Sequence, residues 1–260
     1  MKVGIIGAGN VATHLVKGFL AAGIEVPVVY SRTLASAQEL ANLSPSTKAT
    51  ASLNFQELPH ADVYLIAVPD QALPELVPQF KFPEGVVVAH TSGTQPLEIL
   101  QALSKGSAGV FYPVQTFSKE KEVDWRRVPI CVEGSSPEAE ETLLKLGQRQ
   151  SDQVVVMAGP ARRQLHLAAV FACNFTNHLW GIAQEVLQQA HLPASLLEPL
   201  VEETMRKAFL FPPFQVQTGP AQRGDTSTLE AHLKLLENLP QYQELYKTLT
   251  TSIQAAAKKK

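Results

Sequence analysis

Short apolar runs alternate with longer helical patterns over about the first 110 residues. The runs at residues 3–6, 26–30, 63–68 and 86–90 are nearly unbroken and rich in β-branched side chains. Such runs are typical of strands that are buried on both faces, as in a parallel sheet covered by helices. Helical patterns follow the first two runs, one ending near Ala22 before Gly23 and one over about residues 35–43. The alternation predicts an α/β fold with a doubly wound, mostly parallel sheet.

The pattern changes in the second half of the chain. Residues 109–112, 129–133 and 154–157 are predicted to form the last strands, with a helix over residues 137–149. From Gly159 onward only helical patterns occur, at residues 161–191, 196–210, 228–236 and 242–257. The segment from Ser227 to Glu230 fits a capping box at the start of the third of these. We therefore expect a Rossmann domain over residues 1–158 and an all-helical domain over residues 159–260.

A glycine-rich turn follows the first predicted strand. Residues 7–12 match the pattern G-x-G-x-x-G/A, with Gly7, Gly9 and Ala12 at the small positions. Gly7 permits the tight turn, Gly9 lets the backbone approach a pyrophosphate, and Ala12 allows close packing of helix and strand. Asn10 and Val11 then stand at the start of the helix, where free amides and the helix dipole favour an anion. The motif predicts dinucleotide binding through Gly7, Gly9, Asn10 and Val11.

The end of the second predicted strand distinguishes NADP from NAD. An NAD site usually has an acidic residue about 20 residues after the glycine motif, for the ribose 2′-hydroxyl. Here Ser31 and Arg32 stand at that place, and Glu25 lies at the wrong end of the strand. A hydroxyl and a guanidinium suit a 2′-phosphate. We expect NADP(H) as the cofactor, held by Ser31 and Arg32; the alternative is that Arg32 is only a solvated surface residue.

Two further loops fall where ligands bind in open α/β sheets, beyond the carboxyl ends of parallel strands. Val68 and Pro69 end one predicted strand, and Ser92 follows the next. We expect these three residues to line the cofactor cleft. Each loop could instead be an ordinary strand-ending turn.

Composition and charge exclude several other classes of protein. The chain has 260 residues, of which 45% are hydrophobic and 18% charged, and a net charge of −2. A globular protein with so little net charge has no global field to attract nucleic acid or an anionic membrane. Cys131 and Cys173 lie in apolar stretches without metal-ligand spacing, so neither a metal site nor a disulfide framework is expected. Because neither a signal peptide nor a membrane span is recognisable, we expect a cytoplasmic protein.

These motifs together resemble a known group of dehydrogenases. The resemblance lies in residues 7–12, 30–33, 109–117, 166–178 and 218–225 and covers essentially the whole chain. The chain resembles the superfamily of 6-phosphogluconate dehydrogenase, pyrroline-5-carboxylate reductase and prephenate dehydrogenase. Within it, the chain is most similar to NADP oxidoreductases with a C-terminal helical domain of unknown function. The resemblance implies a Rossmann domain, NADP(H) and a helical domain that often forms a homodimer.

The long predicted helix after the Rossmann domain carries candidates for chemistry. His166, Val170, Asn174 and His178 recur every four residues, which places them along one slowly drifting face. Histidine exchanges protons near neutral pH, which suits reduction of a carbonyl or imine, and Asn174 could orient a substrate oxygen or the nicotinamide amide. We expect His166, Asn174 and His178 to be catalytic. The alternative is that they form hydrogen bonds across a helix–helix interface.

The resemblance sharpens this only in part. Prephenate dehydrogenase-like enzymes have a similar spacing of histidine, polar residue and histidine in this helix. The β-hydroxyacid dehydrogenases instead use a lysine there, and residues 161–191 contain none.

Arg223 is a candidate substrate ligand in the loop after Gly219. A guanidinium can bind a substrate carboxylate through two parallel hydrogen bonds. Arg223 could alternatively pair with Asp225, or Asp225 could cap the following helix.

The sequence thus predicts an NADP(H)-dependent oxidoreductase that acts on a small carbonyl, imine or hydroxyacid. We also expect a homodimer through the helical domain. The alternative from another class is a non-catalytic protein that binds or senses NADP(H), because the cofactor motif is clear while no complete proton relay is recognisable.

Overall fold

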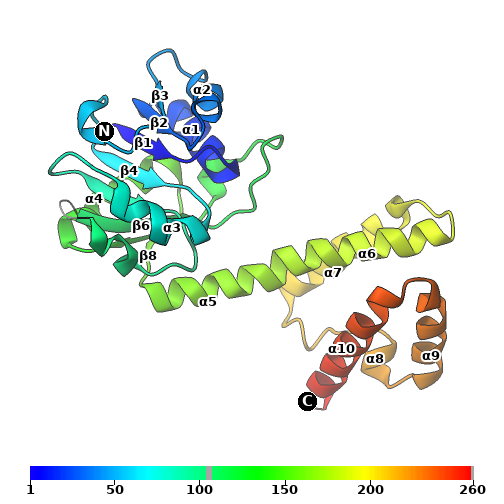
Figure 1. Cartoon of the computed structure of the whole chain (residues 1–260). Helices are drawn as coiled ribbons and strands as arrows, with labels where there is room; N and C mark the ends of the chain where they lie inside the picture. The colour runs from blue at the N-terminus through cyan, green and yellow to red at the C-terminus, as the bar shows by residue number, and fades with distance from the viewer. Residues whose placement is uncertain (104–106, 259–260) are drawn as a thin grey trace. The chain divides into compact units, whose positions relative to one another are not determined.

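The computed structural model of the chain describes residues 1–103 and 107–258. It divides into two compact units, Met1–Cys173 and Asn174–Lys260 (Figure 1). The first contains a sheet and its covering helices, and the second contains helices. The helix α5 (Gly159–Ala169) belongs to the first unit, whereas the domain boundary after residue 158, inferred from the change of sequence pattern at Gly159, stays a prediction.

The sheet of the first unit has eight strands within the described residues, in the order β3-β2-β1-β4-β5-β6-β7-β8. All neighbours pair in parallel except β6 and β7. This arrangement confirms the predicted doubly wound α/β fold. The strands are β1 (Val3–Ile6), β2 (Val28–Tyr30), β3 (Lys48–Thr50), β4 (Val63–Ile66), β5 (Val87–His90), β6 (Ser107–Pro113), β7 (Ile130–Gly134) and β8 (Val154–Val156). Of these, β3 has no counterpart in the sequence-based prediction.

Apolar side chains fill both faces of the sheet. In β4, Val63 and Leu65 pack into one buried cluster, and Tyr64 and Ile66 pack into another. This division follows from the strand period of two, which sends successive side chains to opposite faces. A strand with both faces covered must be apolar throughout, which explains the unbroken runs in the sequence.

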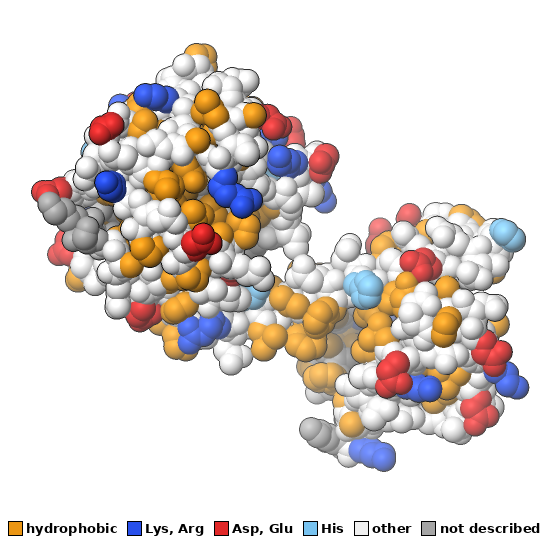
Figure 2. Space-filling model, viewed as in Figure 1, with side chains coloured by type: hydrophobic (Ala, Val, Ile, Leu, Met, Phe, Trp, Pro, Cys, Tyr) orange, Lys and Arg blue, Asp and Glu red, His pale blue; other side chains and the backbone are white. Residues whose placement is uncertain are grey.

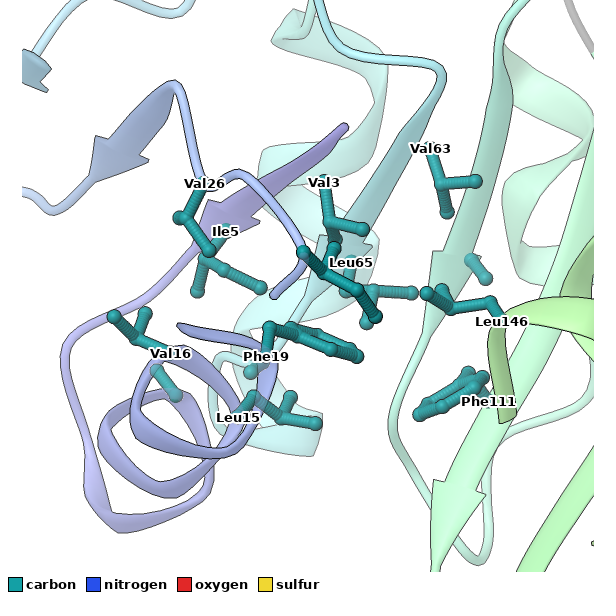
Figure 3. Close-up of a cluster of buried hydrophobic side chains, with 14 of the residues drawn as sticks. Val3, Ile5, Leu15, Val16, Phe19, Val26, Val63, Leu65, Phe111 and Leu146 are labelled. Atoms are coloured by element: carbon teal, nitrogen blue, oxygen red, sulfur yellow. The ribbon is translucent and has the colours of Figure 1, made fainter. Parts of the chain in front are cut away.

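Helices and the segments between them provide the rest of each cluster. Leu15 and Phe19 of α1 (Asn10–Ala21) lie against Ile5 and Leu65, with Phe111 of β6 beyond them (Figure 3). The remaining helices of this unit are α2 (Leu34–Ala41), α3 (Leu73–Leu76) and α4 (Pro137–Gln150). The packed core fixes the strand ends, and the loops that follow those ends carry the site.

The second unit consists of helices, as predicted. A π-helical turn (Val170–Phe175) joins α5 to α6 (Thr176–Gln189). The others are α7 (Glu198–Leu210), α8 (Pro220–Arg223), α9 (Thr226–Leu235) and α10 (Pro240–Ala257). The predicted capping box at Ser227 is wrong, because the Asp225 carboxylate accepts the cap hydrogen bond from the Thr228 amide at 3.1 Å. Among the described residues, no helix is long and apolar enough to span a bilayer.

Candidate functional site

The carboxyl ends of the four neighbouring strands β2, β1, β4 and β5 bring the predicted cofactor residues to one edge of the sheet. Backbone hydrogen bonds extend the pairing beyond the strands, from the Gly7 amide to the Tyr30 carbonyl (2.8 Å) and from the Ala67 amide to the Ile6 carbonyl (2.7 Å). The chain runs β1, β2, β3 in one direction and then crosses back to place β4 beside β1. Ligands of open α/β sheets bind at such a switch point. Gly7, Ser31, Val68, Pro69 and Ser92 all follow strands at this edge.

Glycine is required at the two positions of the turn for different physical reasons. Gly7 has φ of +129°, and a Cβ on it would lie 2.2 Å from the Ala67 carbonyl oxygen, so the turn excludes any side chain. Gly9 is the exposed N-cap of α1, offers no side-chain acceptor, and a Cβ on it would meet nothing within 4 Å. The space beside Gly9 and the amides of Asn10 and Val11 therefore suits a pyrophosphate.

Arg32 is exposed just beyond β2. Among the described residues it forms no ion pair. Burial raises the pKa of the neighbouring Tyr30 phenol, and the positive charge of Arg32 opposes that rise. The guanidinium is thus available for an anion, and the residues present fit the 2′-phosphate of NADP(H).

A loop after β6 crosses the start of α1. The side-chain amide of Asn10 donates to the Phe117 carbonyl (3.0 Å), and the His14 imidazole Nε2 lies 2.8 Å from the Ser118 carbonyl oxygen. The Phe117 ring stacks on His14 and contacts Trp125. The Asn10 side chain thus helps to hold this loop, and the role of Asn10 in cofactor binding stays a prediction. The sequence pattern gave no signal for this contact.

The Ser92 hydroxyl holds the loop after β5 rather than pointing freely into the cleft. It donates to the Asp70 carboxylate at 2.7 Å and accepts from the amides of Thr94 and Gln95. The Thr94 hydroxyl also donates to Asp70, at 2.6 Å. Asp70 and Thr94, which the sequence analysis did not select, thus fasten this loop to the one after β4. A cofactor role of Ser92 stays a prediction.

His90 lies below this loop and has no exposed surface. Its Nδ1 accepts from the Ser92 amide at 3.2 Å, so its Nε2 carries the proton that is donated to the Pro96 carbonyl. Burial and, secondarily, the positive charge of Arg162 lower the pKa of His90 to about 4. His90 is therefore a neutral structural donor at neutral pH.

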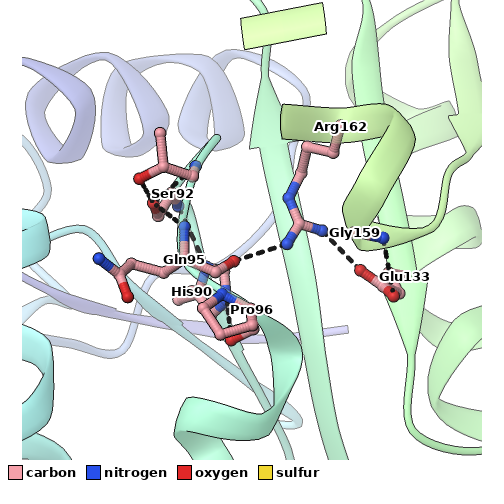
Figure 4. A network of polar contacts seen from close by, with 8 residues as sticks. His90, Ser92, Gln95, Pro96, Glu133, Gly159 and Arg162 are labelled. Atoms are coloured by element: carbon pink, nitrogen blue, oxygen red, sulfur yellow. Dashed lines mark hydrogen bonds and ion pairs between the residues drawn. The ribbon is translucent and has the colours of Figure 1, made fainter. Parts of the chain in front are cut away.

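Arg162, which is fully buried in α5, joins three segments of the first unit (Figure 4). Its guanidinium donates to the Glu133 carboxylate of β7 at 2.5 Å and to the Gln95 carbonyl at 2.6 Å. Glu133 also accepts from the Gly159 amide at the start of α5. This network fixes α5 against β7 and against the loop after β5, and so sets the place of His166, one helical turn further along.

His166 forms a pair with Tyr112, the last residue but one of β6. The Nδ1 of His166 lies 3.1 Å from the Tyr112 hydroxyl. Both side chains press on Gly93, where a Cβ would lie 2.7 Å from His166 Nδ1 and 2.8 Å from Tyr112 Cζ. Burial, reinforced by Cys131 and Asp70, raises the pKa of the Tyr112 phenol, which Arg162 partly opposes. The phenol is therefore protonated at neutral pH. The sequence analysis missed Tyr112 as a site residue, although its place at a strand end was a signal.

The other predicted residues lie in the second unit. Asn174 and His178 have exposed side chains. Arg223 is exposed and approaches the Asp225 carboxylate to 4.0 Å, while Asp225 caps α9. Both alternatives foreseen for this pair thus occur, and roles of Asn174, His178 and Arg223 in binding or catalysis stay predictions.

The fold and the site define a dinucleotide-binding protein of the Rossmann class. The model of the family "NADP oxidoreductase coenzyme F420-dependent" matches residues 2–93, and that of a domain of unknown function, DUF2520, matches residues 128–253. The structure of BF3122 from Bacteroides fragilis, named a "putative NADP oxidoreductase", is 38% identical with a TM-score of 0.90, over 98% of each chain. No curated protein sequence matches the chain.

Two further solved structures share the fold alone. A reductive aminase from Aspergillus terreus, in complex with NADPH and ethyl-5-oxohexanoate, is 15% identical with a TM-score of 0.76, covering 99% of this chain and 94% of that one. A pyrroline-5-carboxylate reductase from Coxiella burnetii is 19% identical with a TM-score of 0.58, covering 99% and 97%.

The identity to BF3122 over nearly the whole length shows that this chain belongs to the same family of NADP oxidoreductases, in which the DUF2520 domain follows the Rossmann domain. Membership confirms the predicted resemblance and the predicted class of cofactor, NADP(H).

Proposed function

We propose that the protein is an NADP(H)-dependent oxidoreductase that transfers hydride to or from a small carbonyl, imine or hydroxyacid. The observation that carries the proposal is the Tyr112–His166 pair, which contacts Gly93 at the same edge of the sheet as the dinucleotide turn. The reductive aminase and the pyrroline-5-carboxylate reductase act on nitrogen compounds by their names, and at 15% and 19% identity they make imines one class to test.

The pair provides the proton that must accompany a hydride. When bound, the nicotinamide supplies the hydride in the direction of reduction. The substrate oxygen or nitrogen then needs one proton, which the Tyr112 phenol gives while His166 passes a proton to the phenolic oxygen. Positioned acid–base groups of this kind contribute typically ~10²- to 10⁴-fold to a rate.

The first experiment tests cofactor binding through Gly9. Since a Cβ at Gly9 meets nothing within 4 Å, Gly9→Val keeps the fold but fills the space for the pyrophosphate. We expect loss of NADPH binding by fluorescence with an unchanged circular dichroism spectrum. Gly181→Val is the matched control, because Gly181 also has open space around a Cβ. Equal NADPH affinity in Gly9→Val and the wild type would refute this binding mode.

The second experiment tests the proton relay. NADPH oxidation is measured with a panel of keto acids and cyclic imines, and then with Tyr112→Phe and His166→Asn. We expect a fall in kcat of ~10²-fold or more in each variant with NADPH affinity retained. Unchanged kcat in both variants would remove the assigned roles. Tight NADPH binding without hydride exchange to any acceptor would favour the non-catalytic sensor instead.

We propose further that a second copy of the chain covers the helices of the second unit. None of the residues of α6, α7 and α10 is buried, and hydrophobic side chains are visible over this unit in Figure 2. A monomer rarely exposes so many large apolar side chains. They include Leu179, Val186, Leu200, Val201, Met205, Phe209, Leu210, Phe211, Phe214 and Leu249.

Sedimentation equilibrium tests the homodimer. Leu200→Asp places a charge on α7, where Leu200 is 62% exposed, and we expect it to shift the protein to monomer. The control Leu34→Asp alters a similarly exposed leucine (55%) of the first unit and should leave the dimer intact. If the wild type is a monomer at micromolar concentration, the homodimer proposal is wrong. The proposed hydride transfer does not depend on that result.

A further inference from the structure

A pocket of about 340 Å³ is lined by residues of the dinucleotide turn, of α1, of α2 and of the loop after β6. It lies in the first unit and is separate from the Tyr112–His166 pair. Its lining residues include Ala8, Lys17, Ser36, Glu39 and Lys119.

The pocket lies next to the segment that carries the predicted NADP-specific residues. Ala8 belongs to the dinucleotide turn, between Gly7 and Gly9. Ser36 stands in the first turn of α2, and its hydroxyl accepts from the Thr33 hydroxyl at 2.7 Å. Thr33 directly follows Arg32. The pocket therefore borders the dinucleotide turn directly, and the hydrogen bond from Thr33 to Ser36 connects it to the segment of Arg32.

Lys119 reaches this pocket from a distant part of the sequence. It follows Ser118 in the loop after β6, which is held on α1 by two hydrogen bonds and by the stacking of Phe117 on His14. His14 is only 2% exposed, so the anchor is part of the folded core. The anchored loop thus places the ammonium group of Lys119 beside α1 and α2.

The charge balance of the pocket favours an anion. Lys17 and Lys119 contribute two ammonium groups against the single carboxylate of Glu39. In the part of the chain that the structure describes, neither lysine is engaged in an ion pair. The side chain of the N-cap residue Thr33 forms no cap hydrogen bond with the first amides of α2, so these amides add to the positive potential near Ser36.

We infer that Lys17 and Lys119 bind the 2′-phosphate of NADP(H) together with Arg32. The loop after β6 is then part of the site that selects NADP(H) over NAD(H). This inference rests on the proposed function, because it assumes that the dinucleotide lies along the turn at residues 7–12. It adds two specificity-determining residues, one of them far in sequence from the β2 end that usually decides this choice.

The test compares adenosine 2′,5′-bisphosphate with adenosine 5′-monophosphate by isothermal titration calorimetry on the full chain. These probes differ only in the 2′-phosphate and need no catalysis. We expect Lys119→Ala and Lys17→Ala each to weaken the bisphosphate about fivefold to tenfold while leaving the monophosphate unchanged. Lys119→Arg keeps the charge and should retain most of the affinity. Phe117→Ala, which loosens the loop but keeps both lysines, should also lower the preference.

Lys121→Ala is the matched control, since Lys121 lies on the same loop but lines a different pocket. An equal loss in Lys121→Ala would show that only the general field of the loop matters and would overturn the inference. The inference would also be overturned if the wild type preferred the bisphosphate and this preference depended on Arg32 but on neither lysine. The proposed function would stand in that case. If the wild type binds neither NADPH nor NADH, the proposed function fails first.

Discussion

The two units of the chain differ in how far their apolar side chains are buried. In the first, Ile5, Phe19, Leu65 and Phe111 have no exposed surface and join α1 and the sheet into one core. In the second, α6, α7 and α10 contain no buried residue, although each carries large apolar side chains. A unit with its own core can hold the cofactor turn rigidly. If a second copy covers the apolar faces of the other unit, as we propose, the stability of that unit should depend on protein concentration.

The largest expected effect comes from removing one aromatic side chain in each unit. Phe19 is fully buried and Phe209 is 82% exposed. Phe19→Ala should lower the free energy of unfolding by about 3 to 5 kcal/mol, because it leaves a cavity in the core. Phe209→Ala should change the unfolding of the first unit by less than about 0.5 kcal/mol. Urea unfolding, followed by the near-ultraviolet signal, measures both.

The same pair of variants also reports on assembly. Phe209→Ala is expected to weaken the homodimer in sedimentation, whereas Phe19→Ala should not affect association at temperatures where it remains folded. Equal losses of stability in the two variants would break the comparison between the units.

Ion pairs give the next largest difference. Glu133 in the first unit faces the fully buried Arg162, so Glu133→Gln leaves a buried cation without its counter-charge. The expected cost is about 3 kcal/mol. Glu203 in α7 pairs with Arg206 and Lys207 on an exposed surface, where pairs add little, so Glu203→Gln should give no measurable change. Thermal unfolding of both variants at low and high salt provides the measurement, and salt sensitivity of the Glu133 effect would argue against its burial.

The strands of the sheet were predictable because their physics is local. A strand covered on both faces must be apolar along its whole length, and β1, β4 and β5 show this directly. The edge strand β3 was missed, since Lys48–Thr50 is short, only partly buried and ordered by its pairing with β2. The glycine turn was predictable for the same reason as the buried strands, because its residues lie within one short stretch.

Most of the polar site was not predictable, because its contacts join distant segments. Tyr112 and His166 are 54 residues apart, and Glu133 and Arg162 are 29 apart. Their meeting depends on the strand order and on the antiparallel pairing of β6 with β7, which periodicity does not encode. Even the cap of α9 was ambiguous locally, because Asp225 and Ser227 are both good N-cap residues.

Acid should destabilise the first unit through His90. The pKa of about 4 in the folded state lies below the ordinary value of 6.5, so the unfolded chain binds the proton more readily between these values. The stability that His90 contributes is complete above pH 6.5 and is lost as the pH falls toward 4. Between pH 7 and pH 5 the loss is about 2 kcal/mol. Urea midpoints at these two pH values measure it.

The variant His90→Gln separates this effect from other titrations. Its side chain can still hydrogen-bond but does not take up a proton, so the stability of the variant should depend less on pH over this window. An identical slope in the variant and the wild type would show that other groups cause the loss. The second unit should show little of this effect, since His90 lies beneath the sheet edge of the first unit.

The smallest effect concerns how a helix of each unit begins. The Ser136 hydroxyl accepts from the Ala139 amide at 3.3 Å and caps α4, whose buried face packs on β6 and β7. Ser136→Ala should therefore cost about 1 kcal/mol, and Ser136→Thr should restore most of it.

In the second unit Asp225 caps α9 through a carboxylate whose pKa is held low, chiefly by the hydrogen bond from the Thr228 side chain. Because α9 buries only Leu229, Asp225→Ala should be visible as local fraying of α9 in hydrogen exchange, while Ser136→Ala should lower the global stability of the first unit instead. Fraying of α4 alone in Ser136→Ala would mean that even the first unit opens locally, and the contrast between the units would be one of degree.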